Sequence, residues 1–119
     1  MKKIITIGLI TIIALSSCVQ KSYQKTVKYT LNTNGMKGIQ TVGIRGEDRP
    51  LSWKKDSSLV AIQPDNTYQV VITYNTGYKF TEVKFTIDGN FEFQDADNRR
   101  INFSEGDTTY YNAIYNVRN

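Results

Sequence analysis

Short runs of alternating apolar and polar residues make up most of the chain beyond residue 25, and this is the period of a β-strand with one buried face. The alternation is clearest over residues 67–74, where every second residue is tyrosine, valine or isoleucine. Glycine, asparagine, aspartate and proline separate the runs as turn-forming residues. The pattern predicts about eight strands, over residues 26–32, 39–45, 59–63, 67–74, 78–87, 91–94, 100–103 and 108–117.

One predicted hairpin carries an unusual set of side chains. Asp88 and Gly89 form its turn, because glycine accepts a positive φ and aspartate can bond its own backbone. Within residues 84–99 the hairpin and the polar loop after it present a lysine, two phenylalanines, an arginine and several amide and carboxylate groups. A surface of this composition suits a polyhydroxyl ligand.

The residue content also favours strands over helices. Eight tyrosines and five phenylalanines, nearly all between residues 68 and 115, accompany many β-branched residues and few alanines or leucines. A domain of this size, with one cysteine and hence no internal disulfide, must close its core as a sandwich or a barrel. We expect an all-β fold and, of these two architectures, an antiparallel β-sandwich of seven to eight strands.

The first residues are typical of an export signal. Met1-Lys2-Lys3 is positively charged, and the apolar run over residues 4–15 is shorter than the roughly 20 residues that span a bilayer. Leu15-Ser16-Ser17-Cys18 then resembles a bacterial lipobox, in which the signal is cut before the cysteine and the cysteine is acylated. The alternative is an ordinary signal peptide followed by an incidental free cysteine.

Lipidation of Cys18 would keep the protein on a membrane, because several acyl chains exceed the single chain that binds only marginally. Val19 rather than aspartate follows the cysteine, and the resemblance to lipoproteins then implies the outer membrane of the cell envelope. The expected organisation is a signal peptide over residues 1–17, a lipidated tether over 18–25 and one β-domain over 26–119. The leaflet, periplasmic or surface-facing, stays open.

The charge argues against nucleic acid as a partner. Removal of Lys2 and Lys3 with the signal leaves thirteen basic residues against eleven acidic ones, a net charge of about +2. The basic residues form no stripe, and Arg99-Arg100 and Lys54-Lys55 are their densest points. Nucleic-acid binding requires a concentrated basic surface.

The composition also restricts catalysis. The chain contains no histidine, and the single cysteine is expected to be acylated, so nucleophilic schemes and metal sites that need histidine are excluded. Carboxylates for glycoside hydrolysis would come from turn residues, namely Asp88, Glu92, Asp95 and Asp97. Residues 95–98 also lack the full set of oxygen ligands for calcium. We expect no enzyme, no metal and no cofactor.

The long loop over residues 47–56 contains Trp53, the only tryptophan, shortly after Pro50. Two interpretations of this loop tryptophan stand. It either packs as a plug over the end of the sandwich or serves as a stacking platform for the apolar face of a sugar ring.

Three groups of residues then occur in a characteristic order: Gly43-Ile44-Arg45-Gly46 leading to Pro50-Leu51-Ser52-Trp53, then residues 83–89 (Val-Lys-Phe-Thr-Ile-Asp-Gly), then Phe91-Glu92 with Asn98-Arg99. Over residues 41–115 this order resembles a family 20 starch-binding module, a carbohydrate-binding domain with an immunoglobulin-like β-sandwich. The resemblance implies binding of starch or a related α-glucan.

The same resemblance assigns roles to individual residues. Trp53 takes the place of the first stacking tryptophan, Lys84 of the lysine that bonds sugar hydroxyls, and Asn98 of an asparagine that helps to hold the glucan. Phe93 or Phe91 stands where the family has a second tryptophan, so that platform has less area and no N–H. Val83 replaces the family's tyrosine.

Two functions follow from these patterns. The first is a lipid-anchored, non-catalytic protein that binds an α-glucan at the cell envelope. The second is an envelope lipoprotein that uses the same sandwich to bind a protein partner and no sugar.

Overall fold

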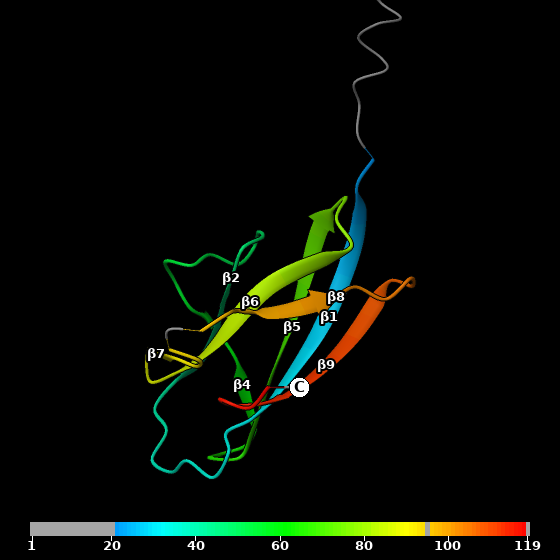
Figure 1. Ribbon diagram of the computed structural model, residues 1–119. Coiled ribbons are helices and arrows are strands. Elements are labelled where there is room, and N and C mark those ends of the chain that lie inside the picture. The colour runs from blue at the N-terminus through cyan, green and yellow to red at the C-terminus, as the bar shows by residue number, and fades with distance from the viewer. Residues whose placement is uncertain (1–20, 95, 119) are drawn as a thin grey trace, which may run out of the picture.

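The structure is a computed structural model that describes residues 21–94 and 96–118. Over these residues it is all-β, with nine strands in two sheets (Figure 1). None of the residues described forms a helix long and apolar enough to cross a membrane. The strands are β1 (Tyr23–Asn32), β2 (Val42–Gly46), β3 (Ser57–Ser58), β4 (Val60–Gln63), β5 (Thr67–Thr76), β6 (Phe80–Ile87), β7 (Asn90–Phe91), β8 (Arg99–Asn102) and β9 (Thr108–Ile114).

The two sheets have the strand orders β4-β5-β1-β9 and β3-β2-β6-β7, with β8 also pairing to β6. We call them the first and the second sheet. Every pairing is antiparallel except that of β1 with β9, which run parallel with Tyr29 opposite Tyr111. The predicted all-β sandwich is confirmed, but the expectation that it is antiparallel throughout is wrong for this pair of strands.

One hydrophobic core lies between the inner faces of the sheets. The first sheet contributes alternate residues of β1 and β5, and the second contributes alternate residues of β2 and β6 together with Ile101 of β8. The rings of Tyr29 and Phe85 meet edge to face across the layers, with centroids 6.0 Å apart. Burial of these alternate apolar faces is the main force that holds the layers together.

The alternation predicted the long strands well and the short ones poorly. The Asp88–Gly89 turn is confirmed, and both residues have positive φ as a tight hairpin turn requires. The strand expected over residues 91–94 is wrong beyond Phe91, because Phe93 has a φ of 48° and the chain turns away from the sheet. β1 begins at Tyr23, so residues 23–25 pair with β5 although they were expected in the tether.

Two tyrosines of the first sheet, from β1 and β5, form a hydrogen-bonded pair in the hydrophobic core. The Tyr29 and Tyr74 hydroxyls are 2.7 Å apart and share a hydrogen bond, and both side chains are fully buried. Burial and the neighbouring Tyr74 raise the pKa of the Tyr29 phenol far above its usual value, while burial raises that of Tyr74 to about 12. Both phenols therefore stay protonated in the folded protein at pH values where an unfolded chain ionises them.

We predict that the free energy of unfolding falls as the pH rises from about 10 toward 12, because the unfolded phenols lose protons that the folded ones keep. Chemical denaturation across this range measures the fall. Tyr74→Phe should make it shallower by up to about 1.4 kcal/mol per pH unit. Tyr110→Phe, which alters an exposed phenol, should leave the profile unchanged. An identical profile for Tyr74→Phe and the unmodified protein would contradict this account.

Candidate functional site

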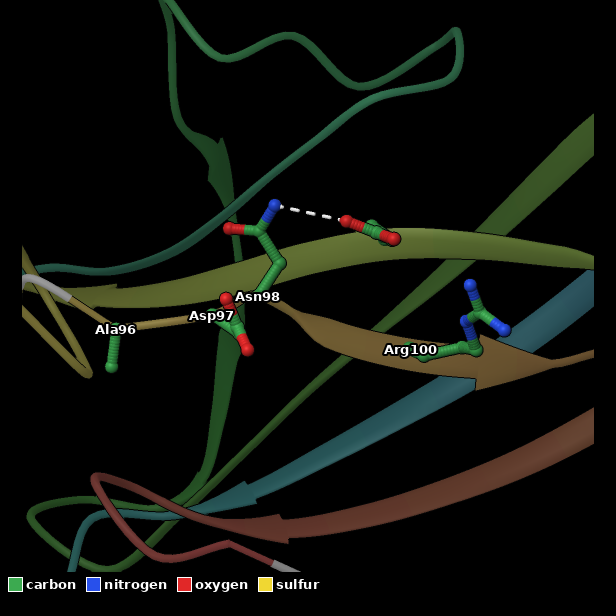
Figure 2. Close-up of a pocket in the computed structure, with 5 residues that line it drawn as sticks. Ala96, Asp97, Asn98 and Arg100 are labelled. Atoms are coloured by element: carbon green, nitrogen blue, oxygen red, sulfur yellow. Dashed lines mark hydrogen bonds between the residues drawn. The ribbon is translucent and has the colours of Figure 1, made fainter.

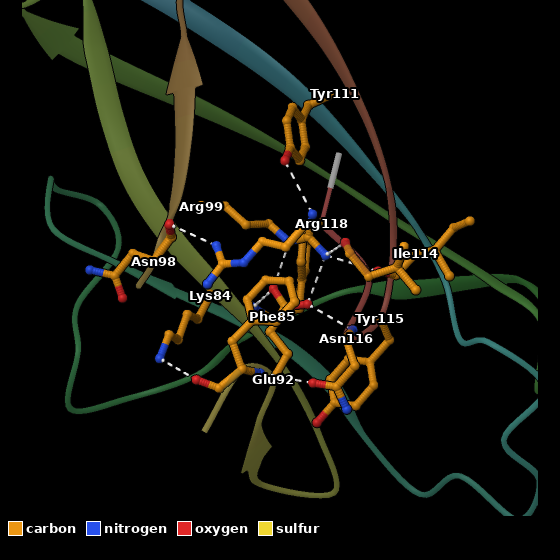
Figure 3. A network of polar contacts seen from close by, with 12 residues as sticks. Lys84, Phe85, Glu92, Asn98, Arg99, Tyr111, Ile114, Tyr115, Asn116 and Arg118 are labelled. Atoms are coloured by element: carbon orange, nitrogen blue, oxygen red, sulfur yellow. Dashed lines mark hydrogen bonds and ion pairs between the residues drawn. The ribbon is translucent and has the colours of Figure 1, made fainter. Parts of the chain in front are cut away.

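The predicted sugar-binding hairpin is organised around a buried ion pair between Glu92 and Arg99 (Figure 3). Arg99 donates from Nε to Glu92 Oε2 at 2.7 Å and from Nη2 to Oε1 at 2.9 Å, and the two side chains are 2% and 0% exposed. Two backbone N–H groups also donate hydrogen bonds to the Glu92 carboxylate, from Phe85 at 3.0 Å and from Asn116 at 3.2 Å. The charge is thus compensated on every side, which a buried ion pair requires.

Arg99 also fastens the C-terminal segment to the sandwich. Its Nη2 donates to the carbonyl oxygens of Ile114 at 2.8 Å and Val117 at 3.0 Å, and its Nη1 donates to the Tyr111 hydroxyl at 3.2 Å. Burial alone would lower the pKa of Arg99, but the bonds to Glu92 and Tyr111 leave it raised, so the guanidinium stays charged. One side chain thereby joins β8, β9, the residue that follows β7 and the residues after β9.

Phe93 is enclosed by cations and does not present an open ring. The Arg99 guanidinium carbon lies 4.8 Å from its ring centroid and that of Arg118 lies 3.8 Å away. Arg118 is itself held by the backbone carbonyls of Asp97 and Asn98. Stacking of a sugar on Phe93 would have to displace a guanidinium that already has partners.

The two polar residues assigned to the ligand have partners within the protein as well. Lys84 Nζ donates to the carbonyl oxygens of Phe93 at 3.0 Å and Ala96 at 2.9 Å, so it fixes the loop after β7. Asn98 donates from Nδ2 to Glu82 Oε1 at 3.1 Å, across a pocket of about 420 Å³ (Figure 2). Both side chains have roles in the fold, and neither has all its hydrogen-bonding capacity free.

Arg45 of β2 contacts both Phe91 and the backbone of Trp53. The Arg45 guanidinium carbon is 5.0 Å from the Phe91 ring centroid, and its Nη1 donates to the Trp53 carbonyl oxygen at 3.0 Å. Its Nε makes a 2.7 Å ion pair with Asp56. Gly43 makes this packing feasible, because a Cβ there would lie only 2.8 Å from Asp56 and from the Thr86 hydroxyl.

Trp53 borders a groove that is open to solvent. The loop between β2 and β3 forms this groove, of about 870 Å³, with β5, and its lining includes Ser52, Trp53, Thr73 and Asn75. The indole is half-buried, and its Nε1 donates to Glu47 Oε2 at 2.8 Å. That bond fixes the orientation of the ring in the groove, which we call the Trp53 groove.

The predicted residues therefore lie in three surroundings. Lys84, Phe93 and Asn98 gather in the hairpin network, Phe91 packs against Arg45, and Trp53 lines the Trp53 groove. Thr73 and Asn75 of the Trp53 groove were missed by the sequence reasoning. The signal for Thr73 was present, because it occupies an outward-facing position of the clearest alternating strand. Asn75 lies one residue beyond the predicted end of that strand, which in the structure continues to Thr76.

No model of a known protein family matches the chain, and no curated protein is significantly similar to it. The starch-binding resemblance therefore stays a prediction carried by the motifs. Cys18, the predicted lipidation residue, lies outside the described residues. Over the described ranges, histidine, cysteine, aspartate and glutamate side chains form no group of three or more that could hold a metal ion.

We predict that Arg99→Met lowers the free energy of unfolding by about 3–5 kcal/mol, because it leaves the Glu92 carboxylate buried without its cation. Urea denaturation gives the difference. The matched control is Arg45→Met, which removes an ion pair whose side chains are 22% and 27% exposed, and it should cost about 1 kcal/mol or less. Equal losses in the two variants would show that burial does not set the strength of the Glu92–Arg99 pair.

Proposed function

We propose that this protein is a lipid-anchored, non-catalytic carbohydrate-binding protein of the bacterial cell envelope, and that it holds its ligand in the Trp53 groove. The observation that carries the proposal is the indole of Trp53, held by Glu47, in a groove that Thr73 and Asn75 also line. The Asn75 amide offers donors and an acceptor there, while the Thr73 hydroxyl shares a 3.0 Å hydrogen bond with that of Thr26. A sugar ring needs both kinds of surface, an apolar plane for its C–H face and donors and acceptors for its hydroxyls. An open groove suits a chain of sugars more than a single small molecule.

The ligand class follows from the sequence motifs. Their resemblance to starch-binding modules favours an α-glucan, and an immunoglobulin-like sandwich is part of the same proposal. The internal hydrogen bonds of Lys84 and Asn98 favour a reduced version of such a site, with Trp53 as its main platform. Phe91 is covered by the Arg45 guanidinium and does not line the Trp53 groove.

The location follows from the N-terminal pattern. Signal cleavage before Cys18 and acylation of that cysteine would place the sandwich at a membrane, for which the outer membrane is the proposed site. β1 begins at Tyr23, five residues after Cys18, so the chain between them reaches at most about 18 Å. A polysaccharide bound in the Trp53 groove would be retained close to the cell surface or in the periplasm.

A second candidate is binding of a protein partner without sugar. It is favoured by β4, an edge strand whose four residues are all exposed, with Val60 and Ile62 at 67% and 60%. Edge strands with exposed apolar side chains can accept a strand from another chain. A discrete partner captured by the protein, lost in a Val60→Lys variant and indifferent to glucan, would favour this function.

We predict that the protein binds soluble starch or a cyclic maltooligosaccharide, and that Trp53→Ala weakens binding at least tenfold by removing the stacking plane. Titration calorimetry with the cyclic sugar gives both affinities. Tyr110→Ala is the matched control, since it removes an exposed aromatic ring from the outer face of the first sheet, and it should bind as the unmodified protein does.

Two results would contradict the proposal. Absence of binding to any α-glucan by the unmodified protein would remove the ligand class. Full binding by Trp53→Ala together with loss in Lys84→Gln would place the ligand on the hairpin, as the family pattern implies, and not in the Trp53 groove.

A further inference from the structure

The end of the sandwich at which β1 begins has a surface of its own. We call it the anchor end, made of residues 21–23, the β5–β6 turn (77–79) and the β8–β9 loop (103–107). The N-terminal chain packs directly on the turn, because a Cβ at Gly77 would lie 2.9 Å from the Lys21 carbonyl oxygen. Figure 1 shows β1 entering beside this turn.

Two tyrosines at the anchor end are exposed to solvent and do not belong to the hydrophobic core. Tyr23 continues the inward-facing alternation of β1 past the end of the core and is 58% exposed, and Tyr78 in the turn is 71% exposed. Together with the half-buried Phe103 they line one groove of about 470 Å³. Tyrosine, with an apolar ring and a polar tip, is the residue type that accumulates at membrane–water interfaces.

The charges around these rings are also suited to a membrane. Lys21 and Lys79 are exposed beside the tyrosines, where they can reach anionic head groups. Lys25 has a different role, because its Nζ donates to the carbonyl oxygens of Ser104, Glu105 and Gly106 at 3.0–3.3 Å. It holds the β8–β9 loop in place, and that loop contributes the acidic residues of this end, Glu105 and Asp107.

From this arrangement we infer that the anchor end is a membrane-contact surface, which lies on the lipid head groups with Tyr23 and Tyr78 at the interface. The inference rests on the proposed acylation of Cys18, since a short tether from that residue delivers this end of the sandwich, and no other, to the bilayer. The contact would orient the domain in addition to the anchor, with the opposite loops directed away from the membrane.

The single tryptophan permits a direct test with the full chain, expressed in bacteria and purified from their membranes. Mass spectrometry first establishes whether Cys18 carries acyl chains. In a Trp53→Phe background, Tyr78→Trp and Tyr110→Trp each give one fluorescent reporter, and both parent tyrosines are 71% exposed. Tyr110 pairs with Lys28, five residues along β1 from Tyr23, so it lies roughly 17 Å from Tyr23 along the strands and about 10 Å beyond Asp107, the last residue of the β8–β9 loop.

The variants are reconstituted into phosphatidylethanolamine and phosphatidylglycerol vesicles whose acyl chains are brominated near the head group. We expect at least twofold stronger quenching for Tyr78→Trp than for Tyr110→Trp. Lys79→Glu should weaken the quenching in these anionic vesicles and have little effect in neutral ones.

The outcomes separate the inference from the proposals on which it depends. Equal quenching of the two reporters on an acylated protein overturns the membrane-contact surface and leaves the anchor standing. Absence of acyl chains on Cys18 overturns the anchor and the inference together. Glucan binding is measured without vesicles, so absence of glucan binding would be seen independently of the membrane experiments.

Discussion

The Glu92–Arg99 ion pair is the interaction on which the C-terminal half of the structure depends. Withdrawal of two charges from water is expensive, and a buried pair persists only where further hydrogen bonds satisfy the remaining donors and acceptors. Here Glu92 accepts hydrogen bonds from the backbone N–H groups of Phe85 and Asn116 as well as from Arg99. Arg99 also donates to the carbonyl oxygens of Ile114, the last residue of β9, and of Val117 beyond it. The pair therefore determines where the chain leaves the second sheet after β7 and where its C-terminal segment lies.

This constraint decides how the hairpin can be used. Its lysine, asparagine and second phenylalanine serve the loop that the ion pair requires, and their capacity to bind a ligand is correspondingly reduced. The loop between β2 and β3 is free of that requirement. Glu47 and Arg45 hold Trp53 there, and Trp53 lines an open groove. The residues that the resemblance assigns to one sugar site thus lie in separate places, around the hairpin and in the loop between β2 and β3.

The sequence allowed the long strands, the Asp88–Gly89 turn and the all-β class to be predicted, because alternation and turn chemistry are local properties. The parallel pairing of β1 with β9 depends on which strands meet after collapse, and no local pattern encodes it. The local pattern predicts Glu92 as a turn residue of the hairpin, and nothing in that pattern indicates that its carboxylate is buried. The positive φ of Phe93 ends the strand and leaves Glu92 on the core face, where Arg99 is its cation. The contacts of Trp53 escaped prediction because a long loop has no periodicity from which a partner such as Glu47 can be read.

We propose that the ligand-binding surface is the Trp53 groove and that the hairpin is structural. Trp53 contributes the only indole N–H of the chain, so a ¹H–¹⁵N spectrum contains one indole cross-peak, well separated from the Nε–H signals of the arginines. Addition of a cyclic maltooligosaccharide should shift the indole peak and the backbone amides of Thr73 and Asn75, while the Arg99 Nε–H peak stays in place. A stationary indole peak, with shifts confined to the hairpin around Phe93 and Asn98, would contradict the account.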